Sequence, residues 1–186
     1  MKRITALLAI FTLTLWIVLS SCATVPAEKT EKSSSLNWEV YFSPHGGCTD
    51  AIVGELDKAQ NTVLVQAYTF TSYRIAKALP DTHKRGIKVE VILDKSQRTD
   101  QYSSADFLAN SGIPVRIDAQ HAIAHNKVMI IDGETVITGS FNFTKAAEEN
   151  NAENLLVIHD KKLAERYIEN WQEHDRHSEV YVGRAR

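Results

Sequence analysis

The chain has 186 residues, 44% of them hydrophobic, with 21 basic and 23 acidic side chains and a formal net charge of −2. This length predicts a single domain with one sizeable core. The slight acidic excess excludes a broadly basic surface, so any footprint for phosphate groups must be local.

The N-terminus carries the pattern of an export signal. Lys2 and Arg3 precede an apolar run over 4–19, which leads into Leu19-Ser20-Ser21-Cys22. Such a run defines a secretory signal, and a cysteine after Leu-Ser-Ser resembles a bacterial lipobox. We therefore predict a lipoprotein signal peptide over 1–22, lipidated at Cys22. The alternatives are a plain secretory signal and an uncleaved anchor, although the run is shorter than the roughly 20 residues that span a membrane.

Residues 23–37 are polar and include three consecutive serines, which predicts a flexible tether. The protein would then be an exported, membrane-anchored lipoprotein, on the periplasmic side of the outer membrane in a host with two membranes. Without Lys2 and Arg3, 19 basic residues remain against 23 acidic ones, a net charge of −4. For the remaining Cys48, a buried small hydrophobe is favoured over a reactive thiol or an intermolecular bridge.

Strand and helix patterns alternate through the first half of the domain that we predict over 38–175. The expected strands are 38–42, 62–70 and 88–93, and the expected helices are 49–59, 72–84 and 104–109. Three successive strands follow at 126–131, 135–142 and 154–159, and an amphipathic helix over 161–174 precedes a C-terminal tail over 176–186. This order predicts an α/β fold, a single domain with a mixed, mostly parallel β-sheet flanked by helices.

The densest group of polar side chains stands on two of these strands. It reads His125-x-Lys127-x-x-x-x-Asp132, followed by Gly139-Ser140-x-Asn142. Alternate residues of a strand share a face, so His125 and Lys127 are predicted to point the same way. A two-residue turn at Asp132-Gly133 would place His125 opposite Ser140, and a loop two residues longer would place it opposite Asn142. A three-residue loop would break this alignment.

These residue types suit attack on a phosphodiester without a metal ion. A neutral His125 imidazole is a nucleophile near neutral pH, Lys127 supplies positive charge, and the Ser140 and Asn142 side chains donate to phosphate oxygens. Asp132 lies an odd number of positions from His125 and Lys127, so it points to the opposite face of the strand. We assign it to turn structure or to support of the site. The leaving oxygen still needs an acid, which a second copy of His125 would supply in a two-fold homodimer.

Glu153, on the next apolar run, would orient a histidine ring and hold it charged. With it the chain resembles the HKD signature of the phospholipase D superfamily, and more narrowly its small single-motif bacterial endonucleases. The similarity runs from about 39 to 171. It implies a metal-free, cofactor-free dimer with a shared active site and a phosphohistidine on His125. By position it implies a catalytic set of His125, Lys127, Asp132 and Glu153, with Lys127, Ser140 and Asn142 as phosphate ligands.

Two other histidines need an assignment. His121 and His125 form an H-x-x-x-H pattern, which on a helix would indicate a metal pair. The segment instead has the pattern of a loop entering a strand, and no cysteine or further histidine nearby in the sequence completes a ligand set, so we predict no metal site. His45 is predicted to be a solvated loop residue.

Three functions fit these residues. The first is a nonspecific endonuclease acting on DNA, with RNA as a further substrate, and with a local footprint drawn from Lys127, Lys145, Arg74 or Arg98. The second is a phospholipase D-type hydrolase of membrane phospholipids, against which stands the lack of a cationic amphipathic helix or an evident exposed aromatic cluster. The third is a non-catalytic phosphate-binding module, against which stands the intact motif.

Overall fold

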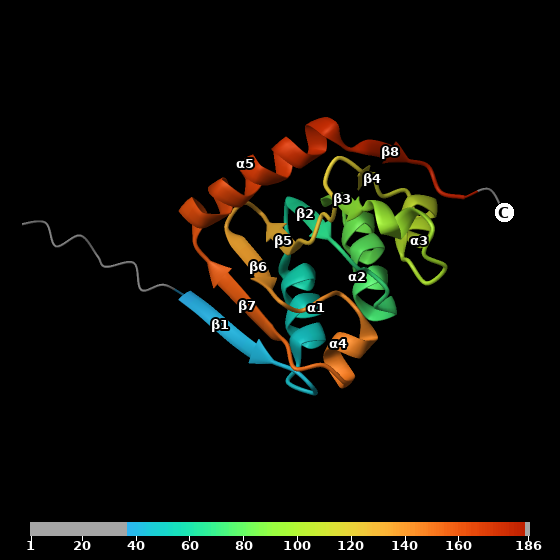
Figure 1. Cartoon of the computed structure of the whole chain (residues 1–186). Coiled ribbons are helices and arrows are strands. Elements are labelled where there is room, and N and C mark those ends of the chain that lie inside the picture. The colour runs from blue at the N-terminus through green and yellow to red at the C-terminus, as the bar shows by residue number, and fades with distance from the viewer. Residues whose placement is uncertain (1–36, 185–186) are drawn as a thin grey trace, which may run out of the picture. The chain divides into compact units, whose positions relative to one another are not determined.

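The computed structural model describes residues 37–184, which form one eight-stranded sheet with helices on both faces (Figure 1). The predicted signal peptide, Cys22 and all but the last residue of the predicted tether lie outside the described residues. The strands are β1 (Asn37–Phe42), β2 (Thr62–Ala67), β3 (Lys88–Asp94), β4 (Val115–Asp118), β5 (Lys127–Ile131), β6 (Thr135–Gly139), β7 (Asn154–His159) and β8 (Glu179–Tyr181). The helices are α1 (Cys48–Lys58), α2 (Tyr73–Lys84), α3 (Ala105–Asn110), α4 (Lys145–Glu149) and α5 (Lys161–His177), with a short 3-10 turn, η1 (Lys95–Arg98).

The α/β class, the single sheet and its mixed character are confirmed, but the sheet is not mostly parallel. The strand order is β1-β7-β6-β5-β2-β3-β4-β8. Parallel pairing is confined to β2 with β3 and β3 with β4, where helical crossovers return the chain in the same direction. The other five neighbouring pairs are antiparallel. A short turn joins β5 to β6, whereas β1 with β7, β2 with β5 and β4 with β8 are strands that lie far apart in the sequence.

Side chains of the central strands point alternately to the two faces of the sheet, which divides the core into two layers. Val63 and Val65 of β2 pack into the larger layer, together with apolar residues of α1, α2 and α3. Leu64, between them, faces the smaller layer, which contains Trp171 of α5. The Trp171 indole Nε1 donates to the Val65 carbonyl at 3.1 Å, so the closing helix is fastened to the middle of the sheet.

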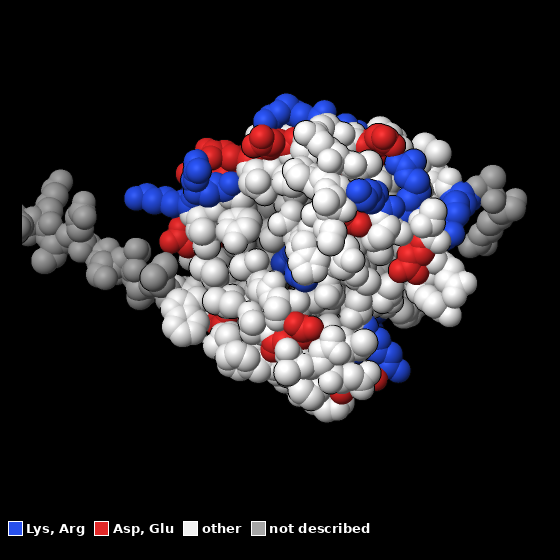
Figure 2. All heavy atoms as spheres, in the orientation of Figure 1, with Lys and Arg blue, Asp and Glu red and all other residues white. Residues whose placement is uncertain are grey.

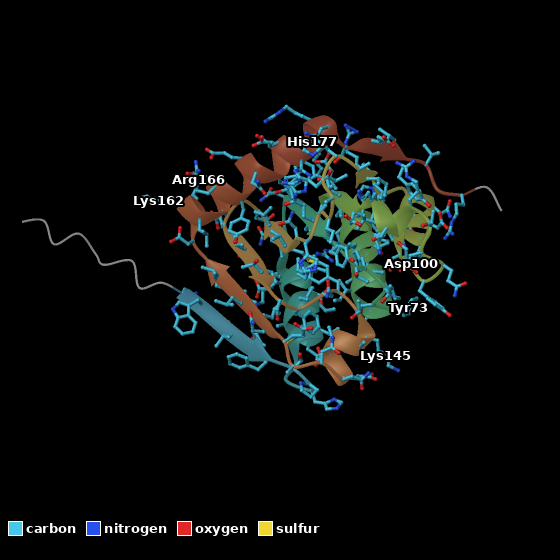
Figure 3. The ribbon with its side chains drawn as sticks, in the orientation of Figure 1. Tyr73, Asp100, Lys145, Lys162, Arg166 and His177 are labelled. Atoms are coloured by element: carbon cyan, nitrogen blue, oxygen red, sulfur yellow. The ribbon has the colours of Figure 1, made fainter. Side chains whose placement is uncertain are left out.

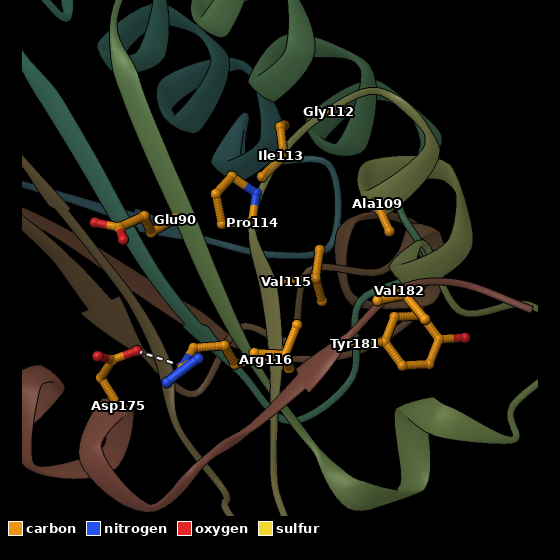
Figure 4. A pocket seen from close by; sticks show the side chains of 11 residues that line it. Glu90, Ala109, Gly112, Ile113, Pro114, Val115, Arg116, Asp175, Tyr181 and Val182 are labelled. Atoms are coloured by element: carbon orange, nitrogen blue, oxygen red, sulfur yellow. Dashed lines mark ion pairs between the residues drawn. The ribbon is translucent and has the colours of Figure 1, made fainter.

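The segment that we expected to be a C-terminal tail is part of the sheet. Helix α5 continues to His177, and β8 pairs with β4, so that Val115 faces Tyr181. At the starts of β3 and β4 these elements line a pocket of about 520 Å³, beside an ion pair between Arg116 and Asp175 (Figure 4). Cys48 is fully buried at the start of α1, as predicted for a small hydrophobe. Within residues 37–184, no helix combines the length and apolar character needed to cross a membrane.

Candidate active site

The predicted motif gathers at one edge of the sheet, where β2 and β3 end. Because β5 runs antiparallel to β2, its first residue Lys127 pairs with Ala67, the last residue of β2. The antiparallel pairing of β6 with β5, and of β7 with β6, brings the end of β6 and the start of β7 to the same edge. Ligand sites of open α/β sheets lie at this edge, beyond the ends of the parallel strands.

His125 is exposed, whereas Lys127 retains only 7% of its accessible surface. The Lys127 Nζ donates to the His125 carbonyl at 3.0 Å and lies 5.1 Å from the centre of the Tyr68 ring. The same ring stands 4.6 Å, centre to centre, from the His125 imidazole. Tyr68 was not among the predicted site residues, because the sequence placed it within a strand predicted over 62–70, whereas β2 ends at Ala67.

The electrostatic environment of Lys127 is that of a cation largely removed from water. Burial lowers the pKa of its ammonium group, and the negative charge of Glu153 acts in the opposite direction. A positive charge in such a place interacts with a bound phosphate more strongly than a solvated lysine does. The loop before it is held by Asp94, whose Oδ2 accepts from the Ala124 amide at 2.7 Å.

Ser140 and Glu153 meet directly at this edge. The Ser140 hydroxyl donates to Glu153 Oε2 at 2.5 Å and accepts from the Asn154 amide at 3.1 Å. Gly139 makes this approach possible, since a Cβ there would lie 2.3 Å from the Asn154 carbonyl oxygen. Among the described residues, the Glu153 carboxylate accepts hydrogen bonds from Ser140 and Asn151 and none from His125, so its predicted role toward a histidine is not met within one chain.

Asn142 lies between two buried phenylalanines that anchor its loop. Phe141 and Phe143 are fully buried, and the Phe143 ring packs edge-on against Phe70 at 5.6 Å. The Asn142 Oδ1 is buried and accepts no hydrogen bond from residues 37–184. The phenylalanines thus fix the backbone that carries Asn142 beside the loop after β2.

The predicted register of the β5–β6 hairpin is wrong. Ile131 pairs with Thr135, which leaves a three-residue turn, and both Asp132 and Gly133 have positive φ values, 55° and 67°. This is the loop length that breaks the expected alignment. Moreover, β5 begins at Lys127 and β6 ends at Gly139, so His125 and Ser140 lie in the loops beyond the paired residues.

Asp132 has a structural position, at the opposite end of β5 from His125. Its carboxylate accepts from three consecutive backbone amides, those of Gln60, Asn61 and Thr62, at 2.9, 2.7 and 2.9 Å. These hydrogen bonds fasten the hairpin turn to the start of β2. The arrangement agrees with our assignment of Asp132 to turn structure and gives it no hydrogen bond to His125, Lys127, Ser140 or Asn142.

Besides Lys127, the three cations predicted for a local footprint form ion pairs with acidic neighbours. Arg74 pairs with Asp50, Arg98 with Glu179, and Lys145 with Glu149. Arg74 and Lys145 line one hollow that Tyr73 also lines; Figure 3 labels Tyr73 and Lys145 on their neighbouring helices. On the face shown in Figure 2, charges of both signs alternate along α5 and much of the remaining surface is uncharged.

His121 and His125 do not form a pair. The His121 ring lies 4.9 and 5.3 Å, centre to centre, from those of His174 and His177, at the end of α5. His45 is exposed, as predicted for a loop residue.

Comparison with known proteins assigns the chain to a family. Residues 52–175 match the family model described as "Cardiolipin synthase, PLD-like domain". The chain is 46% identical over 130 residues to a phospholipase D of Rickettsia conorii, covering 70% of this chain and 65% of that protein. It is 33% identical over 122 residues to a mitochondrial cardiolipin hydrolase of Xenopus tropicalis, covering 63% of this chain and 58% of the relative. The chain therefore spans about two thirds or less of these relatives.

Two solved structures share the fold over most of the described residues. Nuc of Salmonella typhimurium, a phospholipase D family member, has a TM-score of 0.76 and 41% identity, covering 78% of this chain and 98% of Nuc. NucT of Helicobacter pylori has a TM-score of 0.73 and 25% identity, covering 78% and 99%. The sheet, the gathered motif and these matches together show that the chain belongs to the phospholipase D superfamily of phosphodiesterases.

Proposed function

We propose that this protein is a metal-independent endonuclease that cleaves DNA, and also RNA, through a phosphohistidine on His125. The observation that carries the proposal is an exposed His125 imidazole next to a buried Lys127 cation, at the edge where Ser140 and Glu153 meet. The coverage of 98% of Nuc at 41% identity supports nucleic acid as the substrate.

The chemistry follows from these positions. The neutral His125 ring attacks phosphorus in line with the leaving oxygen and forms an N–P bond as the P–O bond breaks. Lys127, with donors from Ser140 and Asn142, stabilises the charge on the non-bridging oxygens. Water then attacks the phosphohistidine and releases the phosphate end.

The acid that protonates the leaving oxygen is the second element of the proposal. No other histidine of residues 37–184 hydrogen-bonds or stacks with His125, whose one aromatic neighbour there is Tyr68. A two-fold homodimer would place the partner's imidazole opposite the first, one ring attacking and the other protonating. Glu153 would then act on a histidine across the dimer rather than within its own chain.

The test uses residues 35–186, a compact unit of the chain, with supercoiled plasmid and excess chelator. We expect cleavage that survives chelation and is lost by at least 1,000-fold in His125→Ala, because the nucleophile is removed. A His45→Asn variant, which keeps a residue that tolerates a left-handed backbone, is the control. Loss of cleavage on chelation in a protein that stays folded would refute metal-independent cleavage. Retained plasmid binding without turnover in the unaltered protein would identify a phosphate-binding module instead.

A membrane phospholipid is the second candidate substrate, and one feature favours it. Trp38, Val40 and Phe42 alternate along the edge strand β1 and are 54, 39 and 65% exposed, which forms an apolar stripe that the sequence did not reveal. Such a stripe suits contact with a lipid surface. The same assay with vesicles containing anionic phospholipid separates the two: lipid turnover with intact plasmid would replace the nuclease assignment.

A lipid on Cys22 would hold the domain at a membrane, and it remains part of the proposal. The lipobox-like Leu19-Ser20-Ser21-Cys22 and the polar stretch after it support this anchor. We expect labelled palmitate to be incorporated into the full chain and not into Cys22→Ser. Equal labelling of both chains would refute lipidation at this residue.

A further inference from the structure

A group of side chains that the proposed chemistry does not use surrounds the end of β4. Asp118, the last residue of that strand, is fully buried. His121 comes from the loop that follows, and His174 and His177 come from the last turns of α5, where Figure 3 labels His177. One imidazole nitrogen of each histidine and a carboxylate oxygen of Asp118 all lie within 4.8 Å of one another.

The three rings are arranged around a single oxygen atom. Asp118 Oδ2 lies 2.6 Å from His174 Nδ1, 3.0 Å from His121 Nδ1 and 3.3 Å from His177 Nε2. The ring centres form a nearly equilateral triangle with sides of 4.9, 5.3 and 5.3 Å. Tetrahedral zinc with bonds of about 2.0–2.1 Å holds its ligand atoms about 3.4 Å apart. The His121 and His177 nitrogens lie near this spacing from Oδ2, and the 2.6 Å contact of His174 would lengthen when an ion is bound.

Hydrogen bonding alone accounts for only part of this cluster. His174 and His121 bond to the Asp118 carboxylate, and the Gln120 amide bonds to its other oxygen. The His177 Nε2 is buried and lies 3.3 Å from Asp118 Oδ2, but it forms no hydrogen bond with any residue in 37–184. A buried ring nitrogen that makes no hydrogen bond is unfavourable, and a shared cation would satisfy all three rings at once.

We propose that Asp118, His121, His174 and His177 bind one zinc ion in a tetrahedral site with three nitrogens and one oxygen. Three imidazoles with one carboxylate suit zinc and disfavour Mg²⁺ and Ca²⁺, which prefer oxygen ligands. All four positions come from the protein, as in structural rather than catalytic zinc sites. Binding takes the Nδ1 lone pairs of His121 and His174, so each of these rings then carries its proton on Nε2.

The ion would join segments that are distant in the sequence. The two ligands on α5 are three residues apart, and so they share a helix face. The other pair spans the end of β4 and the loop that leads, four residues later, to His125. The ion would therefore fasten the closing helix to this loop. Its four ligands are distinct from Lys127, Ser140 and Asn142, the proposed phosphate ligands.

The test measures zinc itself, on the full chain purified in mild detergent and freed of metal. We expect one zinc per chain by elemental analysis and calorimetry, and an unfolding temperature that rises with free zinc. Cobalt(II) in the same site should give the intense visible absorption of tetrahedral cobalt. Zinc that fails to saturate at one per chain, or cobalt with only the weak absorption of octahedral coordination, would overturn the proposal.

Variants locate the site. The His121 side chain is 44% exposed, so His121→Ala should fold and lose at least 100-fold in zinc affinity. His174→Ala with His177→Ala should abolish binding, and His45→Asn is the matched control because His45 is exposed and outside the cluster. Unchanged affinity in His121→Ala would refute the assignment even if the double variant failed to fold. Zinc affinity is measured without plasmid, so a failed nuclease assay would not change the result for the zinc site.

Discussion

At the scale of single residues, the site depends on a lysine that the fold has largely removed from water. Lys127 is held between the His125 carbonyl and the Tyr68 ring, and burial lowers the pKa of its ammonium group. In the proposed reaction, the charged form of Lys127 is the one that binds a phosphate. Burial strengthens the attraction of this ammonium group to a phosphate, but it also lowers the pKa, so the group loses its proton at a lower pH.

The pH dependence of cleavage should show the loss of the Lys127 proton. Activity should be present at neutral pH and fall as the pH rises through the lowered pKa of Lys127, earlier than for an ordinary lysine near 10.4. Lys127→Arg should lose at least 10-fold in turnover, because a guanidinium differs in shape, and should also lose this alkaline decline. Tyr68→Phe, which removes the neighbouring phenol, should keep it. A decline that persists in Lys127→Arg would assign the titration to another group.

At the scale of elements, the hairpin of β5 and β6 is positioned by its turn as much as by its strands. Asp132 accepts three backbone hydrogen bonds from the segment that begins β2. It thereby ties the β5–β6 turn to β2, and the opposite ends of β2 and β5 lie next to Tyr68 and His125. The resemblance to the HKD signature counts this residue with the catalytic set. The geometry makes it an anchor at the far end of the strand.

Replacing Asp132 should therefore affect stability first. Asp132→Ala should lower the free energy of unfolding by about 1–3 kcal/mol, since it leaves backbone donors without an acceptor and places alanine at positive φ. Asp132→Asn should lose less, because asparagine tolerates this φ and keeps one acceptor. Urea unfolding measures both. A normal urea midpoint combined with lost turnover would instead put the carboxylate in the chemistry.

A second element-scale contact holds the last strand. Asp106 of α3 accepts from the Arg184 amide and side chain and from the Tyr181 hydroxyl, at 2.8, 2.7 and 2.7 Å. Burial raises the pKa of this carboxyl, but these hydrogen bonds outweigh burial and lower it. The folded-state pKa thus lies below the unfolded one.

This contact should stabilise the fold at neutral pH and fail in acid. A lowered pKa contributes stability that is present above the unfolded value, near 3.9, and is lost as the pH falls through the folded one. Asp106→Asn should melt below the unaltered protein at pH 7, and the difference between the two melting temperatures should begin to narrow as the pH falls below about 3.9. Calorimetric scans from pH 7 to pH 3 give this comparison. A constant difference across that range would contradict a charge-dependent contact.

At the scale of the whole molecule, the proposed dimer explains how a chain with one motif could supply both the nucleophile and the acid. Each described chain brings one exposed His125 to the site, and the three histidines around Asp118 are engaged with one another. If attack and protonation use one histidine from each subunit, a dimer with a single altered subunit has no complete site.

Mixing subunits tests this directly. Unaltered chains are unfolded and refolded with increasing shares of His125→Ala, and plasmid cleavage is measured in excess chelator. A shared site predicts that activity falls as the square of the unaltered fraction, because both subunits must be intact. His45→Asn at the same shares controls for refolding losses. A linear fall would mean that each chain works alone.

The sequence by itself determined the local structure and the chemistry of the motif. Strands such as 88–93 and helices such as 72–84 were predicted almost to the residue, because hydrophobic periodicity and turn residues act over short stretches. The spacing of His125, Lys127, Ser140 and Glu153 was also readable, since it lies within thirty residues of chain. Strands β4 and β8 were missed because they have only four and three residues.

Only the tertiary structure decided how these pieces meet. The three-residue turn at Asp132 shifts the hairpin register by one residue, and the amides that bind its carboxylate lie about seventy residues earlier in the chain. His174 and His177 stand more than fifty residues from His121, yet they complete the cluster around Asp118. Such pairings are set by strand register and by the packing of α5 on the sheet, which depend on contacts between distant segments and leave no local pattern.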